Sequence, residues 1–95
     1  MKSRSVIAVL GLIAAGQAWA CSPPATPTAI PDGKTASKEV MLAKKKEIDR
    51  YKRLVEEYLT CEPNPVRIQN AQGELDRVAN RFNAEVRAFK AANGG

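Results

Sequence analysis

Cys21 and Cys61 are the most reactive side chains of this 95-residue sequence. The sequence contains no histidine, and no set of nucleophile, base and carboxylate residues has the spacing of a catalytic site. Redox-active cysteines are usually close together, as in C-x-x-C, whereas these two are separated by about 40 residues. We therefore expect no enzyme, no cofactor and no metal site, and a structural disulfide between the two cysteines if the chain is exported.

The first 20 residues have the three parts of an export signal. Lys2 and Arg4 make the start positive, residues 6–16 are apolar, and Ala18-Trp19-Ala20 has the Ala-x-Ala pattern of a signal-peptidase site. The apolar part is much shorter than the roughly 20 residues that span a membrane. We expect cleavage after Ala20 and a mature protein that is periplasmic or secreted.

A cysteine directly after the cleavage site leaves a second alternative, a lipoprotein acylated at Cys21. Lipoprotein signals usually have Leu three residues before that cysteine, and Ala18 occupies this position here. The Ala-x-Ala pattern therefore favours ordinary cleavage. Acylation would make the protein membrane-anchored and would leave Cys61 without a partner.

Composition and periodicity divide the chain into four segments. We expect residues 1–20 to be a cleaved signal peptide and residues 21–36 to form a Pro-rich extended arm. Residues 37–92 form a helical hairpin, and residues 93–95 form a flexible tail. The 75 mature residues can build only one small core, and chains of this size often need a covalent staple.

Within the hairpin, one helix is expected over about 38–60, with Ser37 as its N-cap. A second helix is expected over about 65–91, where Asn64 can cap and Pro65 suits the first helical position. Apolar residues recur at seven-residue spacing, namely Met41, Ile48 and Val55 on the first helix and Leu75, Phe82 and Phe89 on the second. This pattern predicts an all-α fold, an antiparallel two-helix hairpin that packs like a short coiled coil.

The length of the arm matches the length of the first helix. In a polyproline II conformation, residues 21–30 span roughly 28 Å, which is the rise of about 19 helical residues. The arm can therefore run antiparallel along the first helix, with its tip held by the disulfide. In this arrangement Pro24 and Pro27 lie over Tyr51, Leu54 and Tyr58, and Ile30 lies near Met41. The alternative is a flexible linker, which Pro/Thr-rich segments usually are.

Short motifs in the mature chain resemble a group of small exported proteins of Gram-negative bacteria. The motifs are Ile30-Pro31-Asp32-Gly33, Ser37 at a helix start, Tyr58-Leu59-Thr60-Cys61, Arg81-Phe82-Asn83, and Val86-Arg87-Ala88-Phe89-Lys90. The resemblance covers most of the mature chain and implies the compartment and the architecture. It implies no activity.

The middle of the first helix is basic, although the mature chain as a whole carries a net charge of only +3. The basic residues are Lys44, Lys45, Lys46, Arg50, Lys52 and Arg53. An anionic lipid or lipopolysaccharide surface, or an acidic protein, could bind this stretch. The alternative is an ordinary solvated face with local ion pairs. The mild charge and the expected export argue against nucleic acid as a partner.

These observations predict a small, non-enzymatic helical protein of the cell envelope with a structural or protein-interaction role. Its partner is an unknown protein or a second copy of the chain, because two helices alone often leave part of an apolar stripe exposed. The second hypothesis is a peripheral binder of anionic envelope surfaces through the basic residues, in one version as a lipoprotein.

Overall fold

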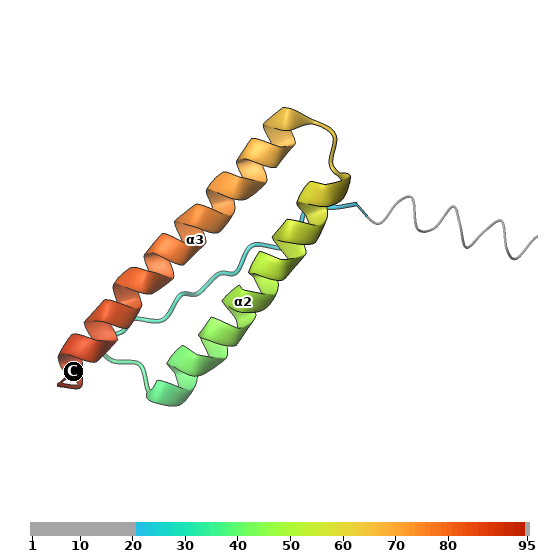
Figure 1. Cartoon of the computed structure of the whole chain (residues 1–95). Coiled ribbons are helices and arrows are strands. Elements are labelled where there is room, and N and C mark those ends of the chain that lie inside the picture. The colour runs from blue at the N-terminus through green and yellow to red at the C-terminus, as the bar shows by residue number, and fades with distance from the viewer. Residues whose placement is uncertain (1–20, 95) are drawn as a thin grey trace, which may run out of the picture.

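The computed structural model describes residues 21–94, so the predicted signal peptide and Gly95 lie outside the described residues. The described chain forms two helices, α2 at Lys38–Cys61 and α3 at Pro65–Ala92, which pack against each other as a hairpin (Figure 1). The all-α hairpin is confirmed, and each helix ends one residue later than expected. Neither helix is both long and apolar enough to cross a membrane.

Both helices begin at the residues whose side chains can cap them. Ser37 Oγ accepts a hydrogen bond from the Val40 backbone nitrogen at 3.2 Å. Asn64 Oδ1 accepts one from the Val66 nitrogen at 2.9 Å, and Pro65 occupies the first turn. Each cap satisfies a backbone donor that has no partner within the helix. Only residues 62–64 connect the two helices. Because this connection is short, the helices are antiparallel neighbours.

The core lies along the seam between α2 and α3. Val55 is the most deeply buried side chain, at 1% exposure, and Phe82 faces the seam from α3. Phe89 and Leu75 are only partly buried at its edge. The buried apolar residues are Met41, Ile48, Tyr51, Val55, Tyr58, Val78 and Phe82. The predicted seven-residue stripes thus form the core.

The arm is packed rather than free, and the disulfide joins its tip to the end of α2. The Cα atoms of Cys21 and Cys61 are 6.0 Å apart across the bond. The Lys44 ammonium donates to the Thr28 carbonyl oxygen at 2.9 Å, which ties the middle of the arm to α2. The predicted arm along the first helix is confirmed. Figure 1 shows that it runs between the two helices, so it covers the core from one side.

Two details of the predicted arm are corrected. Leu54, which was expected beneath the arm, is 37% exposed, whereas Tyr51 and Tyr58 are buried. The arm is also not one continuous polyproline helix, because Ala29 has φ 56°. The left-handed region costs an L-residue about 1–2 kcal/mol. The bend at Ala29 is accompanied by the packing of Ile30 against the core, which offsets this cost.

The arm ends in a turn that contacts α3. The backbone nitrogens of Thr35 and Ala36 both donate to the Asp32 carbonyl oxygen, at 3.1 and 2.9 Å. Gly33 is buried, and its nitrogen donates to Glu85 Oε1 at 2.8 Å. The turn is therefore held by Glu85 of α3, which is 52 residues away from Gly33 along the chain. Helix α2 begins shortly after the turn.

Candidate binding site

A cleft of about 290 Å³ lies between the arm, α2 and α3. Its floor is apolar and comes from α2, where Tyr51, Val55 and Tyr58 are almost fully buried beneath it. One wall belongs to the arm and the other to α3. The wall residues are Pro23, Pro24, Thr26, Arg67, Asn70, Ala71 and Glu74.

The size of the cleft suits a small group rather than a whole cofactor. Ligand pockets usually hold about 300–1,000 Å³, and a dry cavity of about 150 Å³ binds benzene. The observed volume lies between these values. The cleft can therefore take one or two side chains of a partner, or a short apolar group.

The α3 wall is closed at one end by contacts between the arm and the helix. Thr26 Oγ1 donates to Glu74 Oε2 at 3.4 Å. Arg77 forms an ion pair with the same carboxylate, and this hydrogen-bonded guanidinium is the main reason that the pKa of Glu74 is lowered. Glu74 therefore lies at this end of the cleft as a charged carboxylate that already has two partners, Thr26 and Arg77.

Arg67 marks the other end of the α3 wall, near the connection between the helices. Its side chain is 68% exposed, and its guanidinium lies 3.8 Å from Glu62 Oε1. This distance is beyond the usual hydrogen-bond range. Most of the N–H donors of Arg67 are therefore available to groups outside the protein.

Glu62 is the buried carboxylate of the described residues, with a side chain only 7% exposed. Its oxygens accept the Tyr58 hydroxyl at 2.9 Å and the Asn64 backbone nitrogen at 3.0 Å. The Asn64 bond is the largest cause that lowers the pKa of Glu62. Burial, followed by the bond to Glu62, raises the pKa of the Tyr58 phenol. Glu62 thus joins the end of α2, the connection and the floor of the cleft.

The sequence did not predict that Glu62 is a buried hydrogen-bond acceptor, because Cys61-Glu62-Pro63-Asn64-Pro65 indicates only a helix break. The local signal was a carboxylate directly after a helix, with Tyr one turn before it. The cleft residues of the arm and α3 were also missed, because the groove exists only where three segments meet.

Glu62 gives a prediction about acid stability. Because its pKa is lower in the folded protein than the ordinary value of 4.5, its stabilisation is present above that pH. It is lost as the pH falls through the folded-state pKa. We expect Glu62→Gln to lower the urea midpoint at pH 7 and to reduce the loss of stability between pH 5 and pH 3, roughly the titration range of such a carboxylate.

The control for this prediction is Glu57→Gln, which removes an exposed carboxylate from the same helix. Urea unfolding of the wild type and both variants should be followed by circular dichroism at several pH values. Parallel pH curves for Glu62→Gln and the wild type would contradict the role of Glu62.

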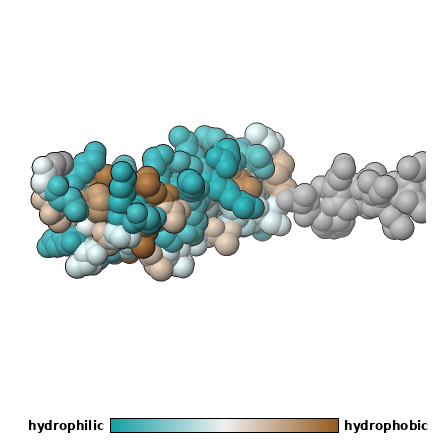
Figure 2. All heavy atoms as spheres, turned by 90° about the horizontal axis from the view of Figure 1, so that it is seen from below, coloured by the Kyte–Doolittle hydropathy of each residue, from teal (hydrophilic) through white to brown (hydrophobic). Residues whose placement is uncertain are grey.

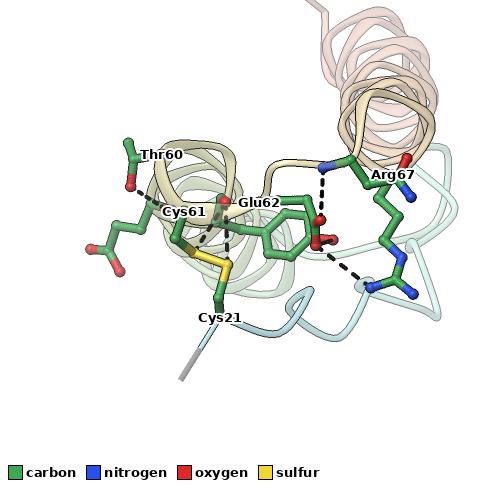
Figure 3. Close-up of a disulfide and its surroundings, with 8 residues drawn as sticks. Cys21, Thr60, Cys61, Glu62 and Arg67 are labelled. Carbon is green, nitrogen blue, oxygen red and sulfur yellow. Dashed lines mark hydrogen bonds and ion pairs between the residues drawn. A yellow bond between two sulfur atoms is a disulfide. The ribbon is translucent and has the colours of Figure 1, made fainter. Parts of the chain in front are cut away.

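Figure 3 shows the disulfide beside the end of α2, with Glu62 next to it. The Tyr58 carbonyl oxygen lies 3.4 Å from Cys61 Sγ and 3.8 Å from Cys21 Sγ. A disulfide sulfur has no proton, so these are packing contacts rather than hydrogen bonds. The described residues contain no free cysteine and no cluster of metal-ligating side chains. A sulfur in this bond cannot at the same time carry a thioether-linked lipid.

The six basic residues of α2 do not form one surface. Lys44 is directed to the arm and to Glu47, and its side chain is only 15% exposed. Lys45 is exposed but forms an ion pair with Asp49 at 2.9 Å. The remaining four are exposed and have no acidic partner among the described residues, namely Lys46, Arg50, Lys52 and Arg53.

A smaller cleft of about 170 Å³ lies between α2 and α3, and no arm residue lines it. Its floor includes Ile48 and Phe82, which are only 8% and 7% exposed. The exposed large apolar residues are Val40, Leu42, Leu54 and Val66. On the face drawn in Figure 2, hydrophobic atoms lie in small patches between hydrophilic ones. The buried and partly buried apolar residues therefore pack within one chain, whereas these four side chains remain exposed.

The comparisons with known proteins identify no relative. The chain matches no protein-family model, and no curated protein or solved structure shows significant similarity to it. The cleft, the charges and the disulfide are therefore the features of the molecule that bear on its function.

Proposed function

We propose that the protein is an exported, non-enzymatic binding protein of the cell envelope that holds its partner in the cleft between the arm, α2 and α3. The observation that carries this proposal is the way the arm wall is held. The disulfide at Cys21 ties one end of the arm, and the Gly33–Glu85 hydrogen bond ties the other. A wall that is already ordered loses little conformational entropy when a partner binds.

Two further features support the envelope as the place of action. The signal pattern before Cys21 is typical of export. A structural disulfide persists in oxidising compartments such as the periplasm or the extracellular space. N-terminal sequencing and intact mass of the native protein test this part. A start at Cys21 without added mass agrees with it, whereas an acyl mass on Cys21 would establish the lipoprotein alternative.

The binding role is tested by filling the cleft. Ala71→Trp places a large side chain in the α3 wall, and Ala43→Trp places the same side chain on an exposed part of α2 as the control. Each protein is expressed in its native cells, and covalent complexes are identified after chemical cross-linking of the intact envelope. We expect the wild type and Ala43→Trp to capture the same partner and Ala71→Trp to lose it. Capture by Ala71→Trp at the wild-type level would refute the cleft as the binding site.

A second candidate function is binding to anionic envelope surfaces, favoured by the four basic residues of α2 that lack acidic partners. Neighbouring lipid charges attract such side chains by about 1 kcal/mol each near the surface. We expect the protein to co-sediment with phosphatidylglycerol vesicles at low salt and to be released at high salt. Lys46→Gln/Arg50→Gln should weaken this binding, whereas Lys34→Gln/Lys90→Gln removes the same charge elsewhere. No binding at low salt would exclude this function.

A further inference from the structure

We propose that the ligand of the cleft is the free C-terminus of a partner polypeptide whose last residue is apolar. This inference rests on the proposed function, since it names the chemistry of the partner. It follows from three features of the cleft, which are the exposed Arg67 guanidinium at one end, an apolar floor, and a polar wall of limited length.

Arg67 is the group that recognises the carboxylate. Its guanidinium is exposed at the open end of the cleft, and its one acidic neighbour within 4 Å among the described residues is Glu62. The Glu62 carboxylate accepts hydrogen bonds from the Tyr58 hydroxyl and the Asn64 backbone nitrogen, so it has hydrogen-bond donors other than Arg67. A guanidinium presents a planar fork of donors that matches a carboxylate in two parallel bonds.

The floor takes the last side chain of the ligand. Tyr51, Val55 and Tyr58 present apolar surface to the cleft, and the rings of Pro23 and Pro24 close it from the arm side. The cleft volume of about 290 Å³ accommodates an aliphatic or aromatic side chain beside part of a backbone. A charged last side chain would lose its hydration here without gaining a partner.

The α3 wall distinguishes a peptide from a simple fatty acid. Asn70 lies between Arg67 and Glu74 on this wall, and its amide is both a donor and an acceptor. An alkyl chain would cover the Asn70 amide without offering it a hydrogen-bond partner, whereas a peptide backbone offers both a donor and an acceptor. Arg67 and Glu74 are two helical turns apart, roughly 10.5 Å. That length equals about three extended residues. The wall can therefore contact the last three residues of a bound peptide.

The closed end of the cleft sets the direction of the ligand. The Thr26–Glu74 hydrogen bond joins the arm to α3 there, and Glu74 would repel a carboxylate. The terminal carboxylate must therefore lie at the Arg67 end. The preceding residues lie along Asn70 and leave the cleft through its open side.

The test uses fluorescence anisotropy with the oxidised mature protein and fluorescein-labelled hexapeptides that end in Ala-Ala-Leu. One peptide has a free C-terminus and the other is amidated. A hydrogen bond to a charged group contributes a factor of roughly 10 to 100 in affinity. We expect amidation to weaken binding by this factor. Arg67→Gln should weaken the free-acid peptide equally and should leave the amidated peptide unchanged.

Three controls separate recognition of the terminus from other effects. Arg87→Gln removes the same charge from an exposed position of α3 outside the cleft and should bind like the wild type. Ala71→Trp should abolish binding of both peptides. A peptide ending in Ala-Ala-Asp should not bind. Circular dichroism with urea unfolding checks that each variant is folded.

Other results would overturn the inference. Equal affinity for the free-acid and amidated peptides, or no affinity for either, would refute recognition of a C-terminus. Binding of a fluorescent fatty acid by the wild type in place of the peptides would assign the cleft to an alkyl carboxylate. In each of these cases the cross-linking comparison of Ala71→Trp and Ala43→Trp still decides whether the cleft binds a partner.

Discussion

Removal of the Cys21–Cys61 disulfide is expected to lower the free energy of unfolding by up to about 4 kcal/mol. The bond closes a loop of about 40 residues, and in the chain-entropy model this loop restricts the unfolded chain by that amount. A domain of this size has a total stability of roughly 4–11 kcal/mol. The bond therefore supplies a large share of the stability, and the reduced protein should be partly unfolded at 37 °C.

The measurement is urea unfolding followed by circular dichroism for the oxidised protein, the reduced protein and the Cys21→Ser/Cys61→Ser variant. The reduced protein and the double variant should share one lower midpoint. Limited proteolysis should cut the arm near residues 26–29 much faster in both, because its tip is no longer tied to α2. A double variant as stable as the oxidised wild type would show that packing alone holds the arm.

The second large effect is expected at Gly33, where the turn of the arm touches the backbone of α3. A Cβ at this position would overlap the Glu85 carbonyl oxygen and would lie 2.8 Å from the Phe89 nitrogen. Both atoms belong to the helix backbone and cannot rotate away, unlike the end of a side chain. Gly33→Ala should therefore push the turn off α3, break the hydrogen bond to Glu85 and cost about 1–3 kcal/mol.

Gly73→Ala is the matched control, because the same substitution within α3 has the opposite expected sign. A Cβ at Gly73 meets no atom within 4 Å. Ala is favoured over Gly inside a helix by about 1 kcal/mol, so this variant should be more stable than the wild type. Thermal and urea unfolding of both variants measure the difference. Stabilisation or no change in Gly33→Ala would mean that the turn does not pack on α3 as described.

The disulfide and Gly33 lie at the two ends of the arm, which forms one wall of the cleft. The disulfide holds the arm at the end of α2, and Gly33 lets the turn reach α3 closely enough for Glu85 to accept its nitrogen. Loss of either contact should loosen Pro23, Pro24 and Thr26 and should weaken any ligand in the cleft. Stability and binding are therefore expected to fall together in both variants.

Local signals determined the helices of this protein. Ser37, Asn64 and Pro65 act on backbone groups within a few residues, and the seven-residue apolar spacing acts within one helix. Such effects can be derived without knowledge of distant contacts. The length of the arm and the oxidising context also predicted the pairing of Cys21 with Cys61. The fold class, the helix limits and the packed, stapled arm were accessible in this way.

The tertiary structure decided where the arm lies and what it forms. The contacts of Thr26 with Glu74 and of Gly33 with Glu85 join residues about 50 positions apart, and no local pattern encodes them. The same holds for the hydrogen bond from the Lys44 ammonium to the Thr28 carbonyl oxygen, which leaves Lys44 mostly buried rather than exposed like the other basic residues of α2. A groove between three segments depends on their relative positions, whereas a helix depends on its own residues. The sequence alone therefore determined the stapled hairpin, and only the packing of the arm between both helices determined the cleft.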